Sequence, residues 1–222
     1  MGHAEVLRME SQANVARVSG PAPHNLKDLL GAAAWARLPA AVRERFKDSA
    51  QVVNYSGEFE VIRASSFGLL VAWVCRLIGT PVVPHTGRNV PAVVRVQPTQ
   101  AGVEWRREYR WHNRRPSIVS STKVVESGGA LVEELPAGLC MALKVYEAAA
   151  VLHFVSHHYY FQFCLPRLGR IRLVLPHWLS PGITHVEHVD LAGGWFRFTM
   201  TVTHPLFGEL FHQTGCFHSS GG

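Results

Sequence analysis

The sequence predicts a mainly β fold: a single antiparallel β-barrel resembling lipocalins or fatty-acid-binding proteins, with two or three short helices near the N-terminal half. From Val52 onward apolar residues mostly alternate with polar ones, which is typical of strands. The strand-like segments follow one another through short turn-like connections such as 100–102, 127–129 and 192–194. Closing such a meander into a barrel removes its unpaired edges.

The composition is that of a folded chain that is poor in charge. Of 222 residues, 47% are hydrophobic and 17% are charged, whereas an average domain has about a quarter charged residues. A disordered chain needs low hydrophobicity and high net charge, so disorder is excluded. We expect residues 1–23 to form a partly ordered leader and residues 24–218 to form one barrel domain.

Helices are predicted in three places. Asn25 can cap a helix whose apolar residues recur at spacings of three and four. A second short helix is expected at 40–47, because Pro39 is tolerated in a first helical turn. Helical spacing returns at 67–78, after the first strand, and Gly-Thr-Pro then ends it. We expect the helix inserted after the first strand to pack at a mouth of the barrel.

Nearly everything after Pro91 is predicted to be strand. A helix-grip fold is the alternative, but it needs a long C-terminal amphipathic helix, and the end of the chain has the pattern of two strands. The expected strands, after the one that begins near Val52, are 92–97, 103–111, 118–127, 131–135, 139–146, 151–163, 183–191, 195–204 and 209–217.

Charge and targeting signals narrow the class of protein. The net charge of +6 comes from basic residues that do not gather into a stripe, which argues against nucleic acid as a partner. The four cysteines lie far apart, as expected of reduced thiols. The chain opens without a signal peptide, and its longest apolar run, 67–79, is shorter than the ~20 residues that span a bilayer. We expect a cytoplasmic protein without a membrane span.

The segment 103–111 has two clearly different faces. Alternate residues of a strand point to opposite sides, and its even positions, Glu-Arg-Glu-Arg, form a ladder of charge for solvent. Its odd positions include Trp105 and Tyr109, with Arg107 between them. A charge on a buried face is costly unless it is paired. We therefore expect Arg107 to meet an acidic partner, either a protein carboxylate or a ligand.

The same alternation supplies candidate partners. Glu133 shares a face with Leu131 and Leu135, and both His185 and Glu187 fall on the face that carries the more apolar residues of 183–191. Arg107, Glu133 and Glu187 are thus predicted to point inward. They form either a buried salt-bridge network that fixes the strand register or a ligand or catalytic site.

Neither a metal nor a cofactor is predicted. In strands, His153 and His157 would lie ~13 Å apart, and His185 and His188 would face opposite sides. The sequence also lacks a nucleophile elbow, a His-Glu-x-x-His motif, a phosphate-binding loop and a dinucleotide fingerprint. Acid–base chemistry without a cofactor stays open.

Several short motifs stand in a fixed order along the chain: Gly-Arg-Asn-Val-Pro at 87–91, Trp105-x-Arg107-x-Tyr109, Leu131-Val132-Glu133, Leu175-Pro176-x-x-Leu179-x-Pro181, Glu187-x-x-Asp190, and Phe196-Arg197-Phe198 followed by Pro205-x-x-Gly208. Together they resemble the bacterial domain-of-unknown-function 4166 family over about 38–217. The resemblance implies a stand-alone copy of a domain also found fused to saccharopine-dehydrogenase-like reductases, hence a reductase-type partner, and no established activity.

The resemblance also carries over particular positions. The family positions matched in this sequence are Trp105, Arg107, Glu133, Glu187 and Pro205. The chain departs from the family pattern at 215–217, where Gly-Cys-Phe replaces a Gly-Trp-Leu-like ending, and at Phe46, where the family often has a histidine.

Three functions remain in competition. The first is binding of a small hydrophobic, anionic or enolisable ligand, with contacts from Arg107, Trp105, Tyr109, Tyr159, Trp195 and His185. The second is a cofactor-independent isomerase or cyclase, in which Glu133 or Glu187 is a general base with a pKa raised by burial and Arg107 stabilises negative charge. The third is a structural partner domain with a filled core. Ligand identity and oligomeric state stay open.

Overall fold

A computed structural model describes residues 25–47, 51–77, 82–126, 128–165 and 169–220. The predicted leader, 1–23, lies outside the described residues. The strands are β1 (Val53–Ala64), β2 (Gly87–Pro98), β3 (Val103–Tyr109), β4 (Ser117–Val125), β5 (Leu131–Glu134), β6 (Leu139–Ala148), β7 (Val151–Leu165), β8 (Gly169–Val174), β9 (Ile183–Asp190), β10 (Trp195–His204) and β11 (Gly208–Ser219).

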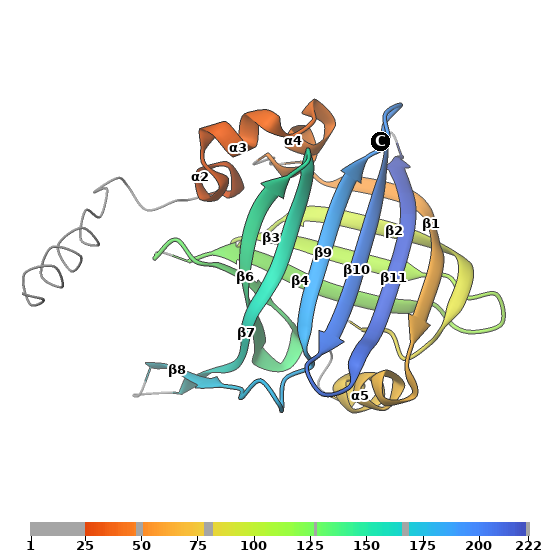
Figure 1. The fold of residues 1–222 in the computed structure, drawn as a ribbon, viewed down its shortest axis with the longest axis vertical. Coiled ribbons are helices and arrows are strands. Elements are labelled where there is room, and N and C mark those ends of the chain that lie inside the picture. The colour runs from red at the N-terminus through yellow and green to blue at the C-terminus, as the bar shows by residue number, and fades with distance from the viewer. Residues whose placement is uncertain (1–24, 48–50, 78–81, 127, 166–168, 221–222) are drawn as a thin grey trace, which may run out of the picture.

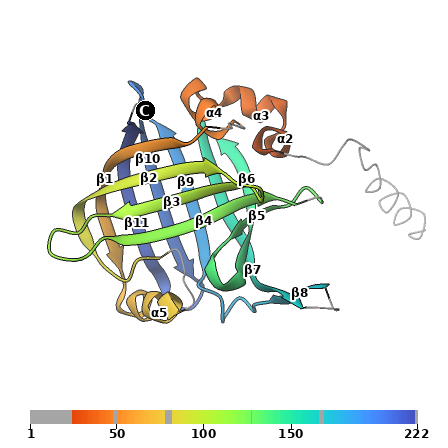
Figure 2. The same cartoon turned by 180° about the vertical axis from the view of Figure 1, so that it is seen from behind.

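The strands close into a barrel by antiparallel pairing. Their order is β6-β5-β4-β3-β2-β1-β11-β10-β9-β7-β8, and β6 pairs with β7 as well. Ten strands therefore form the ring, and β8 pairs with β7 outside it. The predicted antiparallel barrel is confirmed. Figures 1 and 2 show strands β2–β4 on one wall, crossing the direction of β9–β11 on the opposite wall.

Three short helices lie at one end of the barrel: α2 (Leu26–Leu30), α3 (Ala32–Arg37) and α4 (Ala40–Phe46) (Figure 1). The predicted cap is present, because the backbone N–H of Asp28 donates to the Asn25 side chain at 2.9 Å. Gly31, with φ of 78°, ends α2 and divides the predicted first helix in two.

Helix α5 (Ser66–Leu77) closes the other end, following β1 as expected (Figure 2). It lies so close to β11 that a Cβ at Gly68 would stand 1.9 Å from the carbonyl oxygen of Leu210. Only glycine permits that approach. Within the described residues, none of the helices combines the length and the apolar character needed to cross a bilayer.

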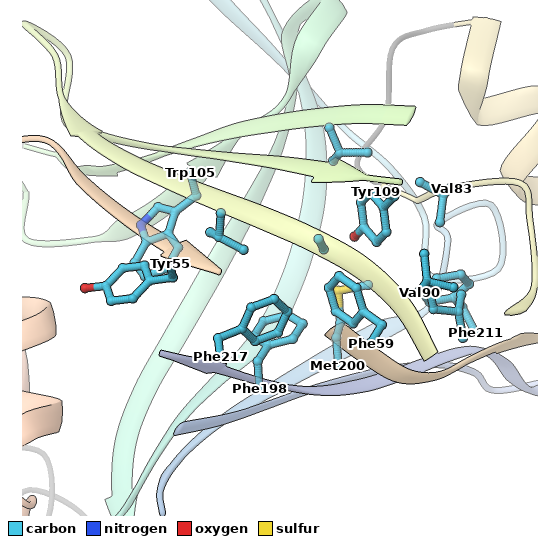
Figure 3. Packing of buried hydrophobic residues seen from close by; sticks show 14 of the residues in the cluster. Tyr55, Phe59, Val83, Val90, Trp105, Tyr109, Phe198, Met200, Phe211 and Phe217 are labelled. Carbon is cyan, nitrogen blue, oxygen red and sulfur yellow. The ribbon is translucent and has the colours of Figure 1, made fainter. Parts of the chain in front are cut away.

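A cluster of aromatic and aliphatic side chains fills much of the interior (Figure 3). The rings of Phe59 and Tyr109 stack with centroids 4.9 Å apart, and Phe217 meets Phe59 edge-on at 5.2 Å. Full burial of one such side chain is worth roughly 1.5–3 kcal/mol. Tyr109, with 0% of its surface exposed, is thus part of the packed core.

Strand β7 contains a one-residue bulge that the alternation argument does not anticipate. Ala142 of β6 pairs with His158, while the next residue, Leu143, pairs with Ser156, so His157 is the extra residue. Phe154 and Ser156 are buried before the bulge, and Tyr159 is buried after it. The bulge therefore shifts which residues of β7 face inward.

Strand β8 was not predicted. All six of its residues are exposed, and basic residues alternate with apolar ones along it. Because β8 has no buried face, its sequence does not distinguish a strand from a basic surface loop.

Candidate functional site

A cavity of about 60 Å³ lies inside the barrel under helix α5. This volume is several times the ~10–15 Å³ that one water needs. Val71 and Ala72 of α5 form one side, Leu139 and Met141 of β6 a second, and Met200 of β10 lies across from them. Most of the lining is apolar, so the few polar groups that reach the cavity determine what it can hold.

The charged groups come from three neighbouring strands. Arg107 lies on β3, Lys123 on β4 and Glu133 on β5, and all three line the cavity. Lys123 and Glu133 are direct partners in the β4–β5 register. Directly opposed residues of an antiparallel pair point to the same face. The inward alternation of three consecutive strands thus brings these side chains together, and we call them the inner cluster.

Within the inner cluster, Glu133 is held more closely by Lys123 than by Arg107. Lys123 Nζ lies 3.0 Å from Glu133 Oε2, whereas Arg107 Nη2 lies 4.0 Å from Glu133 Oε1. A weak hydrogen bond of 3.5 Å joins Arg107 Nη1 to Ser121 Oγ. The three charged side chains are only 11%, 15% and 8% exposed for Arg107, Lys123 and Glu133 respectively. Arg107 is therefore a buried cation with loose protein contacts.

Burial and charge together set the protonation of the inner cluster. Burial would raise the pKa of Glu133, but the charges of Lys123 and Arg107, with hydrogen bonds from Ser121 and Lys123, hold it below its ordinary value. Burial lowers the pKa of Lys123, and Arg107 adds to this lowering while Glu133 opposes it. Since arginine stays protonated, the pair between Lys123 and Glu133 leaves Arg107 as the excess positive charge.

His188 adds a neutral polar group to the cavity wall. The residue is 4% exposed, and its ring meets the ring of Phe46 edge-on at 4.8 Å. Burial, followed by the positive charges of Arg45, Lys123 and Arg107, lowers its pKa well below 6.5. Among the described residues, its Nδ1 has no hydrogen-bond partner. An uncharged imidazole with an unused ring nitrogen thus lies beside the charged groups.

Several predicted site residues line the cavity. Trp105 does so, with its ring stacked on Phe46 at 5.5 Å. Tyr159 does so as well; its hydroxyl lies 2.7 Å from Thr184 Oγ1, and burial raises its pKa to about 12. Tyr159 therefore stays protonated at neutral pH.

Tyr109 is buried but does not line this cavity. Its hydroxyl donates to Gln213 Oε1 at 3.2 Å, within the packed aromatic cluster. Its place on the inner face of β3 is confirmed, and its hydrogen bond is with the protein.

The expected inward positions of His185 and Glu187 were wrong. On β9 the residues that line the cavity are Thr184, Val186 and His188, whereas His185 and Glu187 lie on the outer face, each side chain 37% exposed. Both faces of this segment mix apolar and polar residues. Polar Thr184 is accepted inside because its backbone N–H donates to Ser156 and its hydroxyl meets Tyr159.

Trp195 is also outside the barrel. It is 43% exposed and packs on His218 at 4.5 Å, while the next residue, Phe196, is buried. The expectation that Trp195 forms the inner wall was therefore wrong. Its large aromatic side chain indicated burial, but the alternation of β10 places Phe196 and Phe198 inside instead.

Two residues of the site, Lys123 and His188, were not predicted from the sequence. Lys123 lies on a segment whose two faces have similar residues. The alternation of residues therefore could not predict whether Lys123 points into the barrel or out of it. The turn 127–129 was predicted, and counting back from it across the hairpin would have paired Lys123 with Glu133. His188 could not be distinguished from the other twelve histidines, because its burial depends on rings from α4, β3, β7 and β10.

Comparisons with known proteins identify a family without an assigned activity. A family model described as "Domain of unknown function (DUF4166)" matches residues 38–217, more than half of the chain. The comparison with curated proteins and the comparison with solved structures each find no match. All residues that line the cavity fall inside the matched region. The chain therefore belongs to the DUF4166 family.

Proposed function

We propose that the barrel binds a small hydrophobic anion, such as a carboxylate, enolate or phenolate, with its negative group on Arg107. The observation that carries the proposal is the loose engagement of this buried guanidinium. Within the described part of the chain, its nearest carboxylate is that of Glu133, which lies 4.0 Å from Arg107 and only 3.0 Å from Lys123. The contacts of Arg107 with Ser121 at 3.5 Å and Glu133 at 4.0 Å are long. An anion that reaches Arg107 would add shorter, charge-assisted hydrogen bonds.

The lining supports a ligand with an apolar body. The residues beneath α5 and along β6 and β10 are mainly aliphatic or sulfur-containing, and Phe198 lies 5.9 Å from the Arg107 guanidinium. Its volume of about 60 Å³ favours a small ligand. A larger one would require α5 to move, since that helix forms one side of the cavity.

The protonation of Glu133 favours binding over acid–base catalysis. A general base works best when its pKa lies near the working pH. Burial was expected to raise the pKa of Glu133, but the charges of Lys123 and Arg107 hold this pKa below its ordinary value. Glu133 is thus suited to fixing two cations in place. The expected reductase-type partner stays a prediction.

The test compares matched anionic and neutral probes by calorimetry. We expect acetate, which is small enough for the cavity, to bind the wild-type protein at least tenfold more tightly than acetamide. The reason is that hydrogen bonds to charged groups are worth about 1.5–3 kcal/mol. Arg107→Met should remove this preference. Arg106→Met is the matched control, because Arg106 is exposed on the other face of β3 and should leave the preference unchanged.

The opposite results would overturn the proposal. Equal binding of acetate and acetamide by the wild type, or an unchanged preference in Arg107→Met, would show that Arg107 does not select an anion. Native mass spectrometry of the freshly purified protein gives an independent readout, because a co-purified small acid should be present in the wild type and absent from Arg107→Met.

A further inference from the structure

Three potential metal ligands meet on the outer face of the barrel, on two paired strands. His153 of β7 is the direct partner of Glu187 of β9, and His185 lies two residues before Glu187 on the same face. Directly opposed residues in an antiparallel pair have Cβ atoms about 4.5–5.5 Å apart, and diagonal neighbours are still within reach of long side chains. The strand register therefore brings the three side chains together, and we call them the outer cluster.

The ligand atoms of the outer cluster are spaced like three corners of a metal coordination tetrahedron. His153 Nδ1 lies 3.1 Å from His185 Nε2 and 3.5 Å from Glu187 Oε1, and His185 Nε2 lies 3.9 Å from Glu187 Oε1. Ligand atoms at about 2.0–2.1 Å from a tetrahedral Zn²⁺ are about 3.3–3.4 Å apart. The three observed separations lie on either side of this value.

The side chain of His153 is fixed by its neighbours, whereas the side chains of His185 and Glu187 are open to solvent. The ring of His153 is stacked on Tyr146 with centroids 4.8 Å apart and an angle of 11° between the planes. Its side chain is 11% exposed, whereas those of His185 and Glu187 are 37% exposed. An ion could enter from solvent on the side of these two residues. A fourth coordination position would then face water, as at zinc sites with three protein ligands.

We propose that His153, His185 and Glu187 bind a divalent transition-metal ion, with Zn²⁺ as the best fit. Two imidazole nitrogens favour zinc and its neighbours over Mg²⁺ or Ca²⁺, which take oxygen ligands. The site is independent of the proposed ligand cavity, since all three residues lie outside the cavity lining. The outer cluster was not predicted from the sequence, because the spacing of histidines along one strand does not reveal partners on a neighbouring strand.

The test is zinc titration of the chelator-treated protein, followed by calorimetry. We expect one Zn²⁺ per chain with micromolar or tighter affinity. His185→Ala and Glu187→Gln should each weaken binding at least tenfold. His157→Ala is the matched control, because His157 is exposed on the same strand β7 and lies beside His158, away from the three ligands. It should leave zinc affinity unchanged.

Two further readouts separate loss of a ligand from loss of folding. Without zinc, the variants should unfold at temperatures close to that of the wild type. With zinc, the melting temperature should rise for the wild type and for His157→Ala only, because an ion that binds the native state stabilises it. Co²⁺ in place of zinc should give a visible absorption band in the wild type that is lost in His185→Ala. Failure of the wild type to bind zinc, or unchanged affinity in both ligand variants, would overturn the proposal.

Discussion

The inner and outer clusters both consist of ionisable side chains, but they differ in how far these side chains are exposed to solvent. Arg107, Lys123 and Glu133 are nearly buried, so removing or adding a charge there disturbs the fold. His185 and Glu187 of the outer cluster are more than a third exposed, so water solvates their charges and a change of charge there costs little. Strand β9 contributes to both sides, because His188 faces inward and its neighbour Glu187 faces outward. We therefore expect a change of charge in the inner cluster to affect stability more than a change at His185 or Glu187.

The largest expected effect is that of Glu133→Gln. It leaves Arg107 and Lys123 buried without their carboxylate, and breaking a buried ion pair costs about 3–5 kcal/mol. Urea denaturation would measure this loss of unfolding free energy. The control is Glu134→Gln on the opposite face of β5, expected to change it by less than about 1 kcal/mol. A loss below 1 kcal/mol in Glu133→Gln would remove the proposed difference between the clusters.

The next effect concerns His188 and pH. Its folded-state pKa lies well below 6.5 because of burial and nearby positive charge, so only the unfolded chain takes up this proton as the pH falls below 6.5. The contribution of His188 to stability is thus complete above that pH. Below it, the contribution is lost at up to about 1.4 kcal/mol per pH unit.

Denaturation curves from pH 8 to pH 5 would measure this effect. His188→Phe should lack this part of the acid destabilisation, and above pH 7.5 its stability should vary with pH as that of the wild type does. If the two proteins keep the same pH dependence below 6.5 as well, His188 is not held neutral by burial in the folded protein.

The smallest effect is expected for Glu187→Gln in the absence of metal. Glu187 lies 3.5 Å and 3.9 Å from its two histidine partners and is 37% exposed, so its loss should cost less than about 1 kcal/mol. Urea denaturation in the presence of a chelator is the measurement. A cost above about 2 kcal/mol would place Glu187 among the structural charges and make the two clusters alike.

The extent to which the sequence predicted these features depended on how different the two faces of each strand are. On 103–111, charges fill one face and aromatic residues the other, so the inward positions of Trp105 and Arg107 were predicted correctly. On 183–191 both faces are mixed, and the prediction chose the wrong one for Glu187. Lys123 and the outer cluster depend on which residues face each other across strands, and alternation along one strand carries no such information.

The bulge at His157 divides β7 into two segments that differ in which alternate residues face the interior. Counted from His153, which belongs to the outer cluster, Tyr159 has the parity of an outward residue, yet it lines the cavity. One inserted residue thus resets the phase of the strand between the two clusters. One continuous strand can therefore present His153 outward before the bulge and Tyr159 inward after it, so that β7 contributes to both faces of the barrel wall.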